Sequence, residues 1–253
     1  MGNMNKEAWN RHARRFFSED ISLDVVDYCG LEFPNDTDLN LIGDVSGKRV
    51  LEIGSGSCNC GIALAKQGAH VTCLDLSGNQ LLIGRELAQK ANVTIEQIES
   101  DMTDLSAVPA RSMDLVLSVS AMMYVENIGR VFAEANRVLK PGGRLVFSTN
   151  HPVMMAIGAT ELWPEEKSDP NYGYTGPVVW KWNEKDDFYF TDYRRPLMDY
   201  VNALGENAFH ILRMEELMPK IADTDWDETE KAIRMRFPSV LVIAAQKLRD
   251  LDG

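Results

Sequence analysis

Apolar positions between residues 48 and 150 fall in short runs that alternate with longer amphipathic segments. The short runs predict buried strands, and the amphipathic segments predict helices with one apolar side. Ser77 is placed to cap the second of these helices, and the segment 141–143 (Pro-Gly-Gly) to end the third. This alternation predicts an α/β fold with a doubly wound parallel sheet. Strands are expected over 48–53, 69–75, 93–98, 113–119 and 144–149, and helices over 62–67, 77–91 and 128–139.

The composition of the chain changes after residue 150. Nine of its 21 aromatic residues lie between positions 163 and 193, and prolines interrupt this stretch. We interpret 151–195 as an aromatic-rich insert that forms a lid or subdomain. Aromatic side chains dominate small cores and ligand pockets alike, so the insert is compatible with a satellite core, a substrate pocket or both.

The C-terminal part predicts a further helix over 196–207 and two further strands over 208–213 and 238–247. The acidic connection 215–230 is expected to be a solvated loop with a short helix. A length of 253 residues suits one core of the size found in α/β enzymes. We therefore expect a single domain over 1–253, made of an N-terminal helical cap (1–47), a cofactor-binding core (48–150), the insert (151–195) and a final helix with strands (196–253).

Charge and composition exclude several classes of protein. The chain has 26 Lys and Arg against 38 Asp and Glu, and a net charge of −12 works against binding the phosphates of nucleic acids. Its apolar runs are far shorter than the roughly 20 residues of a membrane span, and its N-terminus lacks the apolar core of a secretory signal. We expect a cytoplasmic protein. The four cysteines and four histidines do not have metal-ligand spacing, so reduced thiols and no metal are expected.

A candidate cofactor site begins where the first predicted strand meets the turn 54–56 (Gly-Ser-Gly). Doubly wound sheets bind cofactors in the crevice beyond the carboxyl ends of their strands. A dinucleotide fingerprint would have its third glycine at Asn59, so this departure weakens the case for NAD. Glu52 lies two residues before the turn, where a carboxylate suits a ligand ammonium. Asp75 ends the second strand, where a carboxylate can accept both hydroxyls of a ribose.

Five motifs follow one another along the chain, at 50–56 (VLEIGSG), 71–76 (VTCLDL), 99–102 (ESDM), 113–118 (MDLVLS) and 137–145 (RVLKPGGRL). They resemble those of the class I S-adenosylmethionine-dependent methyltransferases, and in particular their small-molecule, type 11-like members. One such motif is weak, but five in order are specific. The resemblance covers about 49–150. The family usually has a third glycine where this chain has Cys58, so the turn departs from the family pattern there.

The resemblance implies a Rossmann-like sheet of seven strands, the last antiparallel, that binds S-adenosylmethionine. Glu52 or Asp101 alone also fits an N-cap or loop position, and Gly54 and Gly56 alone fit turn glycines. Their joint order favours the cofactor. The implied contacts are Glu52, Gly54, Ser55, Gly56 and the carbonyl of Ser118 at the methionine end, Asp75 at the ribose, and Leu76, Asp101 and Met102 at the adenine.

The acceptor side is predicted from less specific signals. The segment around Trp9 resembles an N-terminal helix that folds over the cofactor. For a hydroxyl or thiol acceptor, His151 is the best placed general base, followed by His12 and Tyr193. His151 is also compatible with a turn in which its imidazole bonds to the backbone. The expected substrate contacts, each also compatible with a core or surface position, are Tyr124, Arg194 and Trp180.

The resemblance predicts methyl transfer by in-line displacement to an O, N or S atom of a small organic molecule of specialised metabolism. The strand at 113–119 is not followed by the Asn/Asp-Pro-Pro-Tyr motif that related enzymes use on planar nitrogens. The alternatives are an NAD-dependent oxidoreductase, a tRNA-modifying relative and a non-catalytic relative that binds S-adenosylmethionine. We expect a small-molecule substrate, no nucleic acid or membrane partner, and a monomer or homodimer.

Overall fold

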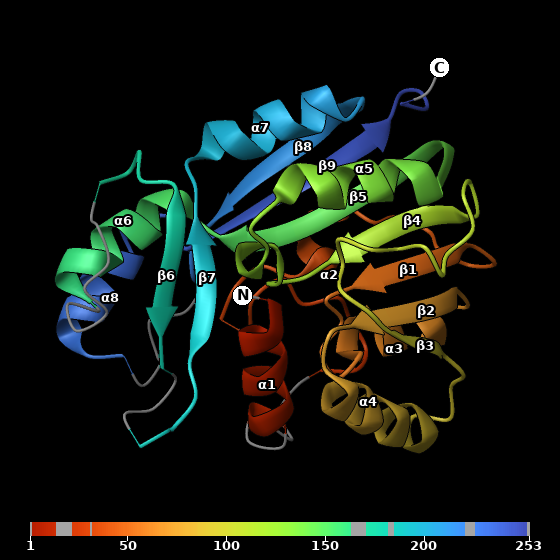
Figure 1. The fold of residues 1–253 in the computed structure, drawn as a ribbon, viewed down its shortest axis with the longest axis horizontal. Coiled ribbons are helices and arrows are strands. Elements are labelled where there is room, and N and C mark those ends of the chain that lie inside the picture. The colour runs from red at the N-terminus through yellow and green to blue at the C-terminus, as the bar shows by residue number, and fades with distance from the viewer. Residues whose placement is uncertain are drawn as a thin grey trace.

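The computed structural model describes residues 2–13, 22–30, 32–162, 171–181, 185–220 and 226–251. Within them, one sheet has the strand order β3-β2-β1-β4-β5-β9-β8, and β6 and β7 form a separate hairpin (Figure 1). The strands are β1 (Arg49–Ile53), β2 (His70–Asp75), β3 (Glu96–Glu99), β4 (Met113–Ser118), β5 (Leu139–Asn150), β6 (Gly176–Trp180), β7 (Phe190–Arg194), β8 (Phe209–Leu217) and β9 (Val240–Lys247). The helices are α1 (Gly2–His12), α2 (Asp36–Leu39), α3 (Asn59–Lys66), α4 (Gly78–Lys90), the 3-10 turn η1 (Met122–Tyr124), α5 (Ile128–Val138), α6 (Pro152–Glu161), α7 (Leu197–Glu206) and α8 (Glu228–Arg234).

The direction of the strands confirms the predicted sheet. Strands β1 to β5 pair in parallel, whereas β9 runs antiparallel to both of its neighbours, β5 and β8. The central strand β1 is buried from Val50 to Ile53, as expected for a parallel sheet covered on both faces. The described residues therefore form the doubly wound sheet of seven strands, with the last strand of the chain reversed.

Alternate residues of the central strands pack into two separate cores. Val50 belongs to the core that includes α3 and α4, whereas its neighbour Leu51 belongs to the core that includes α5 and α7. Strand β4 repeats this division with Leu115 and Val116. Successive side chains of a strand point to opposite faces, so each central strand packs against a core on both sides. This packing holds the carboxyl ends of β1, β2 and β4 in place, where the crevice is expected.

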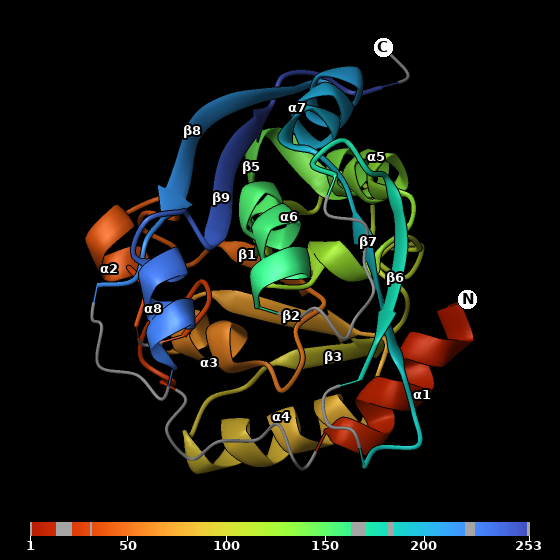
Figure 2. The same ribbon diagram turned by 90° about the vertical axis from the view of Figure 1, so that its left-hand side faces the viewer.

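A second layer of elements lies beyond the carboxyl ends of the strands. Figure 1 shows the β6–β7 hairpin and α6 at that end of the sheet, with α1 between the hairpin and α4. Figure 2, turned by 90°, shows the same elements in front of the strand ends. The predicted insert thus stands next to the crevice. Its residues 163–170 and 182–184, which include Trp163 and Trp182, lie outside the described residues, and the division of the domain into four parts stays a prediction.

The structure moves several predicted boundaries. The strand expected at 93–98 begins at Glu96, because Asn92 is left-handed (φ 54°) and Val93 N–H bonds back to Ala88, which extends the end of α4. The strand expected at 208–213 continues to Leu217, because β8 pairs with β9 as far as Val240. The acidic connection is correspondingly shorter, and it contains the expected short helix, α8.

Two predicted helix boundaries agree with the structure. The hydroxyl of Ser77 accepts a hydrogen bond from Gln80 N–H at 3.2 Å, so it caps α4 as predicted. Helix α5 ends at Val138, just before the Pro-Gly-Gly segment. That segment lies in the irregular start of β5, whose register with β4 shifts between Met113 and Leu115. Helix α3 begins at Asn59, earlier than the expected 62, directly after the glycine turn.

Candidate active site

The glycine turn after β1 is left-handed at two positions. Gly54 has φ 63° and Gly56 has φ 52°, in a region that glycine adopts at little cost. A Cβ on Gly54 would lie 2.5 Å from the Cβ of Ala121 and 2.6 Å from the Cε of Met102. A Cβ on Gly56 would meet no atom within 4 Å. The turn therefore packs tightly at Gly54 and leaves open space at Gly56, where a ligand can approach the backbone.

Cys58 stands where the resemblance expects a third glycine. Its φ is 61°, so the chain keeps a glycine-like conformation despite the side chain. The buried thiol has room because position 84 is a glycine, and a Cβ on Gly84 would lie only 2.6 Å from the Cys58 Sγ. Gln97 Nε2 donates to the same sulfur at 3.5 Å. The departure from the family pattern is thus accommodated, at a conformational cost of about 1–2 kcal/mol.

The carboxylate of Glu52 stabilises the start of the helix that follows this turn. Its Oε2 accepts hydrogen bonds from Gly61 N–H at 2.8 Å and from the Cys73 thiol at 3.6 Å. Gly61 lies in the first turn of α3, whose N-cap residue Cys58 makes no side-chain cap. Glu52 is only 2% exposed, and burial raises its pKa well above the usual range. It holds the start of α3 and does not reach the open space at Gly56.

Two carboxylates follow β2 and β3 at the same edge of the sheet. Asp75 accepts from Gly56 N–H at 2.7 Å through Oδ2 and from Ser77 N–H at 2.8 Å through Oδ1. Burial raises the pKa of Asp75, although both hydrogen bonds oppose that shift. Asp101 accepts from the amide and the hydroxyl of Thr103, each at 2.8 Å. Both residues are half-buried.

The remaining predicted cofactor residues also lie at this edge. Leu76 and Met102 are half-buried, and Met102 reaches over Gly54. Ser55 is buried, and its amide bonds to the carbonyl of Leu74. Ser118, at the carboxyl end of β4, is fully buried, and its hydroxyl has no hydrogen-bond partner among the described residues. The sequence-predicted cofactor residues therefore converge, with Glu52 placed behind the turn.

Helix α1 closes over the same edge and connects it to the insert. The side-chain oxygen of Asn10 accepts from the Ser77 hydroxyl at 2.8 Å and from Asn79 N–H at 3.1 Å. At the other end of the helix, Asn5 exchanges two 2.8 Å hydrogen bonds with the backbone of Thr191 in β7. The side chains of Asn5 and Asn10 thus connect α1 to the hairpin and to the N-terminus of α4.

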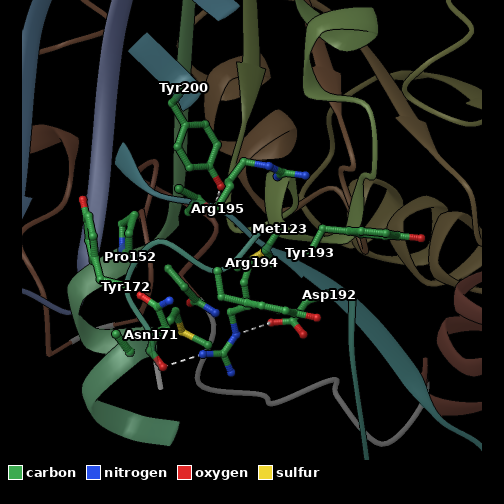
Figure 3. Close-up of a pocket in the computed structure, with 14 residues that line it drawn as sticks. Met123, Pro152, Asn171, Tyr172, Asp192, Tyr193, Arg194, Arg195 and Tyr200 are labelled. Carbon is green, nitrogen blue, oxygen red and sulfur yellow. Dashed lines mark hydrogen bonds and ion pairs between the residues drawn. The ribbon is translucent and has the colours of Figure 1, made fainter. Parts of the chain in front are cut away.

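A cavity lies between the hairpin, α6, η1 and the end of β5 (Figure 3). Asp192 and Arg194 point into it from β7, 5% and 8% exposed, with 3.8 Å between the Asp192 Oδ2 and the Arg194 Nε. The enclosed volume is about 30 Å³, room for roughly two waters. Side chains therefore fill most of the space, and an acceptor of any size has to displace some of them. The wall includes Met123, Thr149, Met155, Tyr172, Tyr174 and Tyr200.

The imidazole of His151 is engaged at both nitrogens. Its Nδ1 accepts from Val153 N–H at 3.2 Å and caps α6, so its Nε2 carries the proton and faces the Glu216 carboxylate at 2.9 Å. The side chain is 1% exposed, and burial lowers its pKa. This geometry matches the turn-forming alternative for His151. The residue adjoins the cavity through Asn150 and Pro152 but does not itself line it.

The other predicted acceptor residues take different positions. Tyr124 and His12 both pack against Trp9 of α1. The ring centroid of Trp9 lies 5.3 Å from that of Tyr124 and 6.2 Å from that of His12. Trp180 stacks at 4.9 Å on Phe190, within the hairpin. Tyr193 lines the cavity, although Figure 3 shows its ring pointing away from Asp192 and Arg194. Burial raises the pKa of Tyr124 and, less strongly, of Tyr193.

Sequence reasoning missed two residues that the structure places at the cavity. Asp192 could have been found, because it shares a strand face with Arg194 two positions later. Arg195 also lines the cavity, but it does not serve as an anion ligand there. It donates instead to the carbonyls of Met122, Val125 and Glu126 and so holds the segment after β4. No short-range pattern distinguishes such a buried structural arginine from a surface one.

No group of three or more His, Cys, Asp or Glu side chains in the described ranges has the arrangement of a metal site. None of the helices in these ranges combines the length and the apolar composition that crossing a bilayer requires.

Comparison with known proteins agrees with the geometry. Residues 51–147 match the family described as a methyltransferase domain, Methyltransf_11. The chain is 38% identical over 118 residues to the uncharacterized methyltransferase YbaJ of Bacillus subtilis, covering 47% of this chain and 46% of that one. It is 31% identical over 162 residues to the demethylmenaquinone methyltransferase of Tropheryma whipplei, covering 59% and 66%. The chain thus spans less than two thirds of the length of both relatives.

A solved structure is similar over a larger part. The S-adenosylmethionine dependent methyltransferase from Mesorhizobium loti superimposes with a TM-score of 0.66 at 27% identity, covering 83% of this chain and 95% of that one. Residues 51–147 carry this methyltransferase domain, and together with the sheet order this similarity supports a class I S-adenosylmethionine-dependent methyltransferase. S-adenosylmethionine is its cofactor, which sets the NAD alternative aside.

Three features of the structure fit this cofactor. The open space at Gly56 lets a ligand approach backbone amides. The half-buried carboxylate of Asp75 lies beside that space and can accept two hydroxyl donors. The buried hydroxyl of Ser118 has no partner among the residues the structure describes, which leaves hydrogen-bonding capacity at the end of β4.

Proposed function

We propose that the protein transfers the methyl group of S-adenosylmethionine to an O, N or S atom of a small organic molecule. The observation that carries this proposal is that the crevice and the cavity share one short segment. Ala121 covers Gly54 in the cofactor turn, and Met123, two residues later, lines the cavity. An acceptor in the cavity would therefore lie next to the crevice, as a direct displacement requires.

We assign the cofactor contacts to the residues that converge at the carboxyl ends of the strands. Asp75 would accept the ribose hydroxyls, and Gly56 would let the backbone approach the methionine part. The Ser118 carbonyl would face the ammonium group. Glu52 would act behind them by holding the start of α3. At the adenine end we assign Leu76, Asp101 and Met102.

The bound cofactor supplies an electrophilic methyl group on a sulfonium. The tasks left to this chain are to orient the acceptor and to exclude water. Helix α1 and the β6–β7 hairpin serve the second task, because Asn5 and Asn10 bond them to each other and to α4. For the first task we favour the cavity residues. A base role is proposed for Tyr193 ahead of His151, whose two nitrogens are already engaged.

A small-molecule acceptor is supported by two observations. The net charge of −12 opposes binding to nucleic acids, and the cavity is enclosed by the hairpin. The Tropheryma whipplei relative is also named for a small molecule, demethylmenaquinone. We further propose that the protein acts in the cytoplasm, as a monomer or homodimer, in specialised metabolism.

The proposal is tested by calorimetric titration with S-adenosylmethionine and S-adenosylhomocysteine. Wild type should bind both, and Asp75→Ala should weaken binding at least tenfold. Asp44→Ala is a matched control, because it removes an exposed carboxylate from the segment before β1, at the opposite end of that strand. Absence of binding by folded wild-type protein would contradict the proposed function, and equal losses in both variants would contradict the role of Asp75.

A further inference from the structure

Asp192 lines the cavity, and one oxygen of its carboxylate has no hydrogen-bond partner among the described residues. Asp192 is 5% exposed, and its Oδ1 is buried and unpartnered among the residues that the structure describes. Its other oxygen, Oδ2, lies 3.8 Å from the Arg194 Nε. A buried carboxylate oxygen without a donor is costly, so native structures rarely keep one. Such an atom on a residue that lines a cavity indicates a site whose missing donor arrives with a ligand.

The surroundings of Asp192 indicate what kind of molecule brings this donor. The walls of the cavity include the rings of Tyr172, Tyr174 and Tyr200 together with the apolar chains of Met123 and Met155. Aromatic rings and thioethers pack well against a flat apolar body. The aromatic rings and thioethers of the wall therefore suit a ring-shaped acceptor.

The charges around Asp192 favour a neutral donor over a cationic one. Arg194 already faces its carboxylate in Figure 3, and the guanidinium of Arg195, three positions after Asp192, also acts on its charge. A ligand ammonium would meet these two cations in a poorly solvated space, where like charges repel strongly. A hydroxyl group can donate to Oδ1 without adding a charge.

We propose that the Oδ1 of Asp192 accepts a hydrogen bond from a neutral hydroxyl group on a ring-shaped acceptor and thereby positions that acceptor in the cavity. This inference rests on the proposed function and deepens it, because it names the acceptor class and the residue that selects it. It makes Asp192 a binding residue, with Arg194 orienting its carboxylate.

The test uses the full chain saturated with S-adenosylhomocysteine and three small probes, followed by NMR titration. Phenol carries the neutral donor, anisole has the same ring without a donor, and benzylamine carries a cationic donor. We expect phenol to bind at least tenfold more tightly than anisole, and benzylamine to bind no more tightly than anisole. Equal binding of phenol and anisole, or no binding of phenol, would overturn the proposal. Tightest binding of benzylamine would overturn the neutral class.

Variants test the residue. Asp192→Asn should weaken the binding of phenol at least fivefold and leave the binding of anisole unchanged. Asp187→Asn is the matched control, since it makes the same change at an exposed carboxylate just before β7 that pairs with Arg11. Unchanged phenol binding in Asp192→Asn would overturn the assignment. The three probes on wild type decide the proposal even if that variant misfolds.

Failure of this inference can be distinguished from failure of the proposed function. Binding of S-adenosylhomocysteine is measured before the probes are added. If the folded wild type does not bind it, the proposed function fails. If it binds and phenol is not preferred over anisole, the proposed function stands and the role of Asp192 is overturned.

Discussion

The Glu52 carboxylate accepts a hydrogen bond from Gly61 N–H at 2.8 Å, so a side chain of β1 caps the first turn of α3. The N-cap residue itself, Cys58, offers no side-chain acceptor. The glycine turn between these two elements is therefore held at both ends. Because the cap comes from inside the sheet, its loss should affect both stability and cofactor binding.

We expect Glu52→Ala to lower the free energy of unfolding by about 1–3 kcal/mol, since it leaves a buried N–H without an acceptor. Glu52→Gln keeps a carbonyl oxygen in the same place and should lose less. Urea unfolding of both variants measures the difference. Equal losses for Ala and Gln would argue that the side chain acts through its packing and not through the cap.

Gly56→Ala should separate folding from cofactor binding. Gly56 and Gly47 both have positive φ, 52° and 69°, and a Cβ on either would meet no atom within 4 Å. Each alanine variant should therefore lose a similar amount of stability, about 1–2 kcal/mol. Only Gly56→Ala should weaken the binding of S-adenosylhomocysteine, by at least tenfold as measured by calorimetry. Equal affinities in the two variants would place the cofactor elsewhere.

Asn10→Ala should loosen helix α1 from α4. It removes the acceptor of the Ser77 hydroxyl and of Asn79 N–H. We expect faster proteolysis near the N-terminus and severalfold weaker cofactor binding. Glu7→Ala, on the same helix, removes an exposed carboxylate that pairs only weakly with Arg11 at 3.7 Å, and it should change neither quantity. If both variants behave alike, α1 does not help to retain the cofactor.

His151→Asn distinguishes a cap from a base. Asparagine is a good N-cap residue, so this variant should keep α6 and the thermal stability, whereas His151→Ala should lose about 1 kcal/mol. We expect His151→Asn to retain methyl transfer to whichever acceptor is found. A loss of more than a hundredfold in kcat, with the melting temperature unchanged, would restore His151 as the general base.

Asp192 should make stability depend on pH in an unusual direction. Burial raises the pKa of Asp192 to about 6, although the charges of Arg194 and Arg195 oppose this shift. The charge of Asp192 in turn helps to raise the pKa of the nearby Tyr124. The folded protein thus holds this proton more tightly than the unfolded chain, and stability falls as the pH rises from about 4 to about 6, by at most roughly 3 kcal/mol.

Asp192→Asn removes that loss. The variant should therefore melt several degrees above wild type at pH 8, and the difference should shrink at pH 5, as scanning calorimetry at the two pH values can measure. An equal difference at both pH values would mean that packing, not ionisation, separates the two proteins.

The sheet could be predicted from sequence because its signals are local. Apolar runs such as Val50–Ile53 identify strands, and the hydroxyl of Ser77 marks a helix start within a few residues. The residues predicted to contact the cofactor lie close together for the same reason, since motifs at the ends of successive parallel strands converge by topology alone. The strand boundaries moved where a single residue decides them, as at the left-handed Asn92.

The acceptor side could not be predicted in the same way. Asp192 reaches its place through a hairpin packed against α1, and His151 is engaged by Glu216, 65 residues away. Such contacts depend on tertiary packing, which no short-range pattern encodes. Histidine and arginine therefore drew attention by their chemistry, whereas the unpartnered aspartate was overlooked.

The position of β9 between β5 and β8 affects how the protein folds during synthesis. Within the described sheet, β8 pairs only with β9, and β5 needs β9 on its outer edge. During synthesis from the N-terminus, β5 therefore waits with an open edge for about ninety residues, until 240–247 have left the ribosome. An open apolar strand edge is prone to aggregation. We expect the nascent chain to depend on chaperones until this last strand inserts, and the finished crevice to appear late in folding.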